Sequence, residues 1–154
     1  MGTSLASSLD HVVSTAVRDY ARPMRLSIRA VMRIIMAAFF AAGFVLHLRA
    51  TDALVAITPS WVPFPREVVL ATGVFELVLA VSLLMPRLRK VSGIVAALYV
   101  LAVWPANFKH AFEHIVTPPI LDSWWYHAPR LALQPVIAWW ALFSTRVVDW
   151  PFRR

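Results

Sequence analysis

The chain has 154 residues, of which 60% are hydrophobic, and it carries a formal net charge of +7. Its mean hydropathy of +0.67 is well above that of a soluble domain, and its length allows one domain. The absence of cysteine from the sequence excludes disulfide bonds and thiol chemistry by the protein's own side chains.

Residues 1–27 have the pattern of an amphipathic segment. Apolar side chains recur at helical spacing before Pro23, at Leu5, Leu9, Val12, Val13, Ala16, Val17 and Tyr20. The continuous apolar core of a secretory signal peptide is missing. We expect an interfacial helix on the cytoplasmic leaflet, with a loosely ordered tail as the alternative.

Four apolar runs follow, at residues 29–48, 67–85, 91–108 and 129–148. Each is long enough to cross the roughly 30 Å hydrocarbon core of a bilayer as a helix, at about 1.5 Å per residue. The alternating pattern of a membrane barrel is missing from the sequence, and a helix satisfies its own backbone in lipid. The sequence therefore predicts an all-α integral membrane four-helix bundle over residues 28–148, with Pro129 opening the fourth helix and a cytoplasmic tail at 149–154.

Basic residues set the expected orientation. If the N-terminus is cytoplasmic, only Arg49, Arg66, Lys109 and Arg130 of the 15 lysines and arginines fall on the outer side. This bias follows the positive-inside rule and predicts that both termini are cytoplasmic. The net charge then reflects topology, so we expect a lipid bilayer and no nucleic acid as the partner.

Glu76 lies in the middle of the second run, nine residues after Glu67. An ionisable group at mid-membrane costs about 2.5 kcal/mol or more unless it is paired, hydrated or protonated. Such a group marks a functional site by default. The alternative is a protonated acid that bonds to Gln134 or Asn107 and only holds the helices in register.

Polar residues gather in the outer half of the predicted bundle, at His47, Glu76, Asn107, Arg130 and Gln134. Arg130 and Gln134 lie one helical turn apart and share a face. We expect a polar pocket open to the extracytoplasmic side, in which Glu76 faces Arg130. Glu76 and His47 are its candidate catalytic residues for proton exchange, and Arg130, Gln134 and Asn107 are its candidate ligand-binding residues. For His47 the alternative is contact with lipid headgroups, and for Asn107 and Gln134 a packing role is favoured.

Prolines also fall inside the outer halves of the third and fourth runs. Pro105 and Pro135 each free a carbonyl four residues earlier, on Leu101 and Leu131. A kinked membrane helix usually lines a cavity or a polar cluster, which supports the same pocket.

Residues His110 to His114 fit the H-x-x-E-H pattern of a family of zinc hydrolases, with Glu113 as the water-activating residue. A zinc hydrolase needs a third protein ligand, and Asp149 lies on the wrong side of the predicted membrane. We therefore predict no metal site, with His110 and His114 as weak candidates. Residues 124–127 are typical of an outer aromatic belt.

An ordered set of motifs resembles the DoxX family of small bacterial membrane proteins. The motifs are Gly43 to His47, the proline-rich loop Pro59 to Pro65, Gly73-Val-Phe-Glu76, Leu84-Met-Pro86, Pro105-Ala-Asn107 and Arg130 to Pro135. The resemblance implies a four-helix protein of the bacterial inner membrane, often linked to respiratory or thiol redox systems through a quinone or a partner protein. It supplies no catalytic residues.

Three functions stay open at this point. The first is a redox-associated subunit that binds a quinone-like or other lipophilic molecule, together with a redox partner protein or a second copy of the chain. The second is a non-catalytic membrane scaffold. The third is a membrane isomerase that uses Glu76 and His47 as acid and base on an isoprenoid-like substrate. Whether the protein is an enzyme stays open with them.

Overall fold

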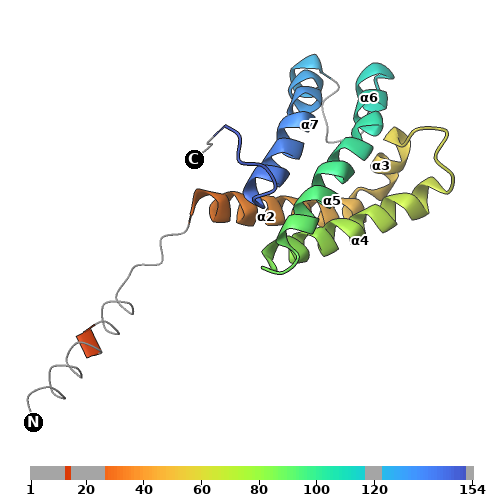
Figure 1. Cartoon of the computed structure of the whole chain (residues 1–154). Helices are drawn as coiled ribbons and strands as arrows, with labels where there is room; N and C mark the ends of the chain where they lie inside the picture. The colour runs from red at the N-terminus through yellow and green to blue at the C-terminus, as the bar shows by residue number, and fades with distance from the viewer. Residues whose placement is uncertain (1–12, 15–26, 117–122, 152–154) are drawn as a thin grey trace, which may run out of the picture.

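The structure, a computed structural model, describes residues 13–14, 27–116 and 123–151. The described residues are mostly helical and contain no strand. The helices are α2 (Ile28–Arg49), α3 (Thr51–Ile57), α4 (Pro65–Leu84), α5 (Arg89–Ala102), α6 (Trp104–Phe112) and α7 (Trp124–Ser144) (Figure 1). The interfacial helix expected in residues 1–27 falls almost wholly outside the described residues, as does the end of the tail at 152–154.

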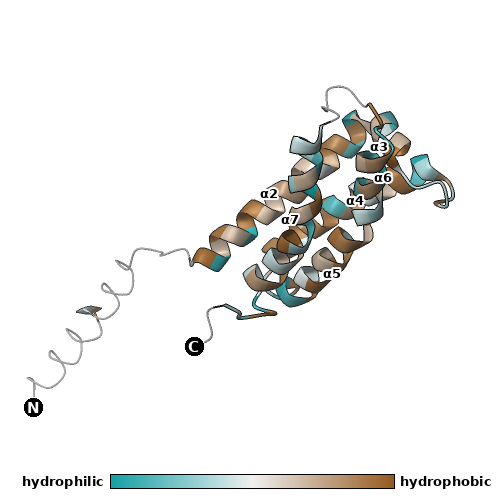
Figure 2. Ribbon diagram, turned by 90° about the horizontal axis from the view of Figure 1, so that it is seen from above, coloured by the Kyte–Doolittle hydropathy of each residue, from teal (hydrophilic) through white to brown (hydrophobic). Residues whose placement is uncertain are grey.

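Three helical stretches among the described residues are long and apolar enough to cross a membrane. They are Ile28–Arg49, Pro65–Leu84, and Arg89–Phe112, which joins α5 and α6. Large apolar side chains on these helices point away from the protein core, for example Ile35, Phe39 and Val78. Figure 2 shows hydrophobic residues along most of the length of the helices. An apolar outer surface of this extent fits contact with a lipid bilayer, in agreement with the predicted membrane protein.

The helices pack as two pairs. α2 packs along α4, and α5 packs along α7, while α2 with α7 and α4 with α5 make the contacts between the pairs. The core between them is formed by Met36, Phe40, Leu79, Leu83, Ala96, Ala97, Val100, Ala138 and Ala141. The alanines let the backbones of α5 and α7 approach closely, as small residues do between membrane helices.

The helix starts follow local capping. Ser27 Oγ accepts a hydrogen bond from the Ala30 amide, and Pro65 occupies the first turn of α4. α7 begins five residues before the expected start at Pro129, because Ser123 Oγ accepts from the Trp125 amide and caps the helix there. Pro129 therefore lies inside α7.

The third apolar run is interrupted. α5 ends at Ala102 and α6 begins at Trp104, with Val103 between them and Pro105 in the first turn of α6. Pro105 has no N–H to donate to an earlier carbonyl, which explains why the regular helix ends here. The stretch runs on to Phe112, four residues beyond the expected end.

The short helix α3 was not predicted from the sequence. Lys109 of α6 holds its C-terminal end, because Lys109 Nζ donates to the carbonyls of Ala56 (2.9 Å) and Thr58 (2.8 Å). A cation is favourable at a helix C-terminus, where unpaired carbonyls carry partial negative charge.

Candidate functional site

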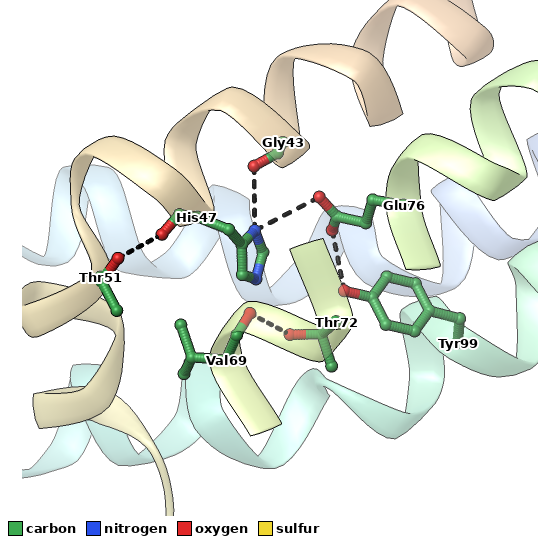
Figure 3. A network of polar contacts seen from close by, with 7 residues as sticks. All are labelled: Gly43, His47, Thr51, Val69, Thr72, Glu76 and Tyr99. Carbon is green, nitrogen blue, oxygen red and sulfur yellow. Dashed lines mark hydrogen bonds and ion pairs between the residues drawn. The ribbon is translucent and has the colours of Figure 1, made fainter. Parts of the chain in front are cut away.

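Glu76 of α4 is buried between α2 and α5, and both of its oxygens face a polar group (Figure 3). Tyr99 Oη of α5 donates a hydrogen bond to Oε1 over 2.8 Å. Nδ1 of His47 on α2 lies 3.4 Å from Oε2. α2 and α5 therefore each supply a polar group that faces the buried carboxyl group of α4.

The imidazole of His47 is fixed by its own helix. Nδ1 lies 2.9 Å from the carbonyl oxygen of Gly43. A carbonyl can only accept a hydrogen bond, so the network assigns a proton to Nδ1. That N–H bonds the Gly43 carbonyl, while Glu76 Oε2 lies 3.4 Å from Nδ1 and has no hydrogen-bond partner among the described residues. Thr51 Oγ1 also donates to the His47 carbonyl over 2.6 Å, at the end of the same helix.

Two glycines make the room for this pair, one on each helix. A methyl group on Gly43 of α2 would lie 2.9 Å from Cδ of Glu76, and one on Gly73 of α4 would lie 2.6 Å from Cβ of His47. Both distances are shorter than real contacts of this kind. Each helix therefore provides a glycine opposite the polar side chain of the other.

The two glycine contacts differ in kind. Gly43 faces the far end of a flexible side chain, which can move away. Gly73 faces the Cβ of His47, which is fixed to the backbone of α2. Loss of Gly43 would displace the carboxyl group, whereas loss of Gly73 would push the two helices apart.

Tyr99 completes the site and was not predicted from the sequence. Its ring packs against Phe40 (centroids 6.2 Å apart) and Phe75 (5.3 Å). One signal was available, because Tyr99 is the tyrosine that falls within the four apolar runs, while Tyr20 and Tyr126 lie outside them. A buried phenol usually finds a hydrogen-bond partner.

Arg130 belongs to a different cluster. Its Nη1 lies 2.8 Å from Nδ1 of His110 on α6, and its guanidinium lies 5.6 Å from the ring centre of Tyr126. Arginine can only donate, so His110 Nδ1 accepts. Within the part of the chain that the structure describes, the polar contacts of Glu76 are to Tyr99 and His47. The expected meeting of Glu76 with Arg130 is not among them.

Gln134 and Asn107 are both buried. Gln134 Nε2 donates to the carbonyl of Val100 over 2.7 Å. Val100 lies in the last turn of α5, where carbonyls lose their helical partners, so this amide supports the helix end just before Val103. Asn107 lies on α6, beyond that break.

The weak metal candidates do not converge. His110 is fully buried, whereas His114 is exposed and lies beyond the end of α6 at φ 48°. The ring of His110 meets that of His127 edge-on, with centroids 4.8 Å apart. No group of three or more metal-ligating side chains occurs among residues 13–14, 27–116 and 123–151.

Comparison with known families gives one match. A family model described as a domain of unknown function, DUF8561, matches residues 36–145, which is more than half of the chain. The protein belongs to the DUF8561 family. The matched stretch contains α4, α5, α7 and most of α2, with the side chains of His47, Glu76, Tyr99 and Arg130. No curated protein and no solved structure matches the chain.

Proposed function

We propose that this DUF8561 protein binds a lipophilic, carbonyl-bearing molecule of the quinone type beside His47, Glu76 and Tyr99, and exchanges protons with it. The observation that carries the proposal is the 3.4 Å approach of His47 Nδ1 to Glu76 Oε2 between two apolar helices. An imidazole and a carboxyl group at this distance can hold and pass on a proton.

The chemistry assigned to the chain is proton transfer. A quinone that takes up two electrons also takes up two protons, and the electrons would come from a redox partner protein. Both protons would come from water and pass one at a time through the His47–Glu76 pair, which is reprotonated after each transfer, while the Tyr99 hydroxyl stabilises the carboxylate left behind through a charge-assisted hydrogen bond. The side chains of His47 and Glu76 keep 14% and 11% of their surface exposed, so the pair is enclosed without being sealed.

The proposed architecture is a four-helix membrane bundle, with α7 as its fourth span. α7 has 21 residues and packs along α5 through Ala138 and Ala141. The motifs shared with the DoxX family and the distribution of basic residues support a bacterial inner-membrane protein with cytoplasmic termini. An interfacial helix within residues 1–27 completes this proposal.

Single-cysteine labelling tests the orientation, because the natural chain has no cysteine. Ser60→Cys, in the exposed loop before α4, should react with an impermeant maleimide in intact cells. Lys90→Cys, exposed at the start of α5, should react only after the membrane is opened. The reverse pattern would invert the proposed topology.

A packing role is the second candidate function. The reciprocal fit of Gly43 to Glu76 and of Gly73 to His47 is what a scaffold would use to fix the register of α2 and α4. Interhelical polar contacts in membranes contribute about 0.6 kcal/mol on average, so the pair would add modest stability in that role.

Glu76→Gln separates the two functions, because the amide keeps the shape of the side chain and removes its titratable proton. We expect the variant to fold while its affinity for a short-chain ubiquinone analogue, titrated in detergent, falls about tenfold or more. Glu67→Gln makes the same change at an exposed position on the same helix and should match the natural protein. Unchanged affinity in Glu76→Gln would leave the packing role.

A further inference from the structure

A corner of the protein brings together the start of α2, the start of α5 and the end of α7. Arg33 Nη1 of α2 donates to the carbonyl of Ser144, the last residue of α7, over 3.4 Å. Thr145 follows and packs on Gly93 of α5, where an added methyl would lie 2.7 Å from Thr145 Cβ. Arg89 lies one turn before Gly93, and Arg146 follows Thr145. These three arginines form what we call the arginine corner.

The arginine corner has unmet hydrogen-bonding capacity. The Nε atoms of Arg33 and Arg89 are buried and have no hydrogen-bond partner. The charges of Arg89 and Arg146 both act against that of Arg33. Like charges in proximity cost free energy, and an anion beside the guanidinium groups would offset that repulsion.

The described residues supply little negative charge at this place. Asp149 pairs with Arg29 at 2.7 Å, and the other ion pairs join Arg66 to Asp52, Lys109 to Glu113 and His47 to Glu76. The C-terminal end of α7 offers roughly half an elementary charge, which is far less than three guanidinium groups. The start of α5 adds positive helix-dipole character and has no acidic residue in its first turn.

We infer that the arginine corner binds a phosphate group, either the headgroup of an anionic phospholipid or free phosphate. Planar guanidinium groups bind phosphate oxygens through paired, charge-assisted hydrogen bonds. Basic pockets between membrane helices bind anionic headgroups in the same way. The arginine corner shares no residue with the His47–Glu76–Tyr99 cluster. Failure of the proposed function would therefore leave this inference unaffected.

Native mass spectrometry of the full chain in detergent tests the inference, with dioleoyl phosphatidylglycerol and dioleoyl phosphatidylcholine as the probes. We expect tighter binding of phosphatidylglycerol, weakened about fivefold or more in Arg89→Gln and in Arg146→Gly. Arg146 has φ 62°, a conformation that glycine adopts without strain, so Arg146→Gly removes the charge while keeping or improving stability. Lys90→Gln, which removes an exposed charge next to Arg89, should bind within about twofold of the natural protein.

The arms of the experiment identify the source of the phosphate. Displacement of phosphatidylglycerol by millimolar inorganic phosphate indicates a site for free phosphate, and resistance to it indicates a lipid site. Equal affinity for the two lipids, without binding of inorganic phosphate, would overturn the inference. An equal loss of binding in Lys90→Gln and Arg89→Gln would also overturn it, because the effect would then be diffuse surface charge.

Discussion

His47 lies beside the acidic Glu76, and His110 lies beside the basic Arg130. The Nδ1 atoms of the two histidines have opposite hydrogen-bonding roles, one as donor and one as acceptor. His47 Nδ1 donates to the Gly43 carbonyl and lies 3.4 Å from Glu76 Oε2, whereas His110 Nδ1 accepts from Arg130. The groups around each ring, and not the residue type, decide where the ring proton lies: the Gly43 carbonyl of the same helix for His47, and Arg130 of α7 for His110. This difference fits the proposal that the His47–Glu76–Tyr99 cluster exchanges protons and that the His110–Arg130 contact is structural.

The largest expected effect is on the contact between α2 and α4 at Gly73, which supports the His47–Glu76–Tyr99 cluster. Gly73→Ala should lower the free energy of unfolding by about 3 kcal/mol, at the upper end for overpacking, because His47 Cβ cannot move without α2. The measurement is reversible unfolding in mixed detergent micelles, followed by circular dichroism. Ala71→Val, at an exposed position of α4, is the control and should change stability by about 0.5 kcal/mol or less. Equal losses in the two variants would refute close contact at Gly73.

Tyr99→Phe tests the second partner of Glu76. Removal of the hydroxyl takes a hydrogen bond from a buried carboxyl oxygen, and we expect a loss of about 1.5 kcal/mol together with weaker quinone binding. Tyr126→Phe is the control, because it removes the hydroxyl of a more exposed tyrosine that lies beside Arg130. If both variants bind the quinone analogue like the natural protein, Tyr99 has no part in the site.

Arg130→Lys tests whether the cluster of Arg130, His110 and Tyr126 has a structural role. A lysine cannot reproduce the planar guanidinium that meets His110 and Tyr126, so we expect a stability loss of about 1 kcal/mol. Affinity for the quinone analogue should stay within about twofold. A loss of affinity as large as that in Glu76→Gln would instead indicate that Arg130 contributes to the ligand site, as the sequence predicted. Arg66→Lys, in an exposed pair with Asp52, controls for the general effect of the substitution.

Gln134→Leu should have the smallest effect. It leaves the Val100 carbonyl without its interhelical donor, which costs about 0.6 kcal/mol on the average for such bonds. Unfolding in the same micelles measures it, with Ser82→Ala as the control, since the Ser82 hydroxyl donates to the Leu79 carbonyl within its own helix. A loss of ligand affinity without a change in stability would mean that Gln134 contacts the ligand.

The sequence predicted the bounds of the helices better than the contacts between their side chains. Length and apolarity placed α2 and α4 to within two residues at each end, because these properties are local. The start of α7 is set by the hydrogen bond that caps the helix at Ser123. The break at Val103 is set by the position of Pro105 in the first turn of α6. Apolarity alone predicts neither. The sequence marked Glu76 and His47 through the cost of burying polar groups. It placed both in one pocket, but it expected Arg130 opposite Glu76 and did not include Tyr99, because pairing depends on helix rotation and contact between helices.

The asymmetry of the two glycine contacts has a consequence for how the DUF8561 family can vary. A side chain at position 43 collides with the tip of Glu76, so a shorter residue at position 76 would accommodate it, and the two positions should covary. A side chain at position 73 collides with a Cβ that every residue except glycine carries at position 47. Position 73 should therefore stay glycine across the family even in members whose residues at positions 47 and 76 have diverged.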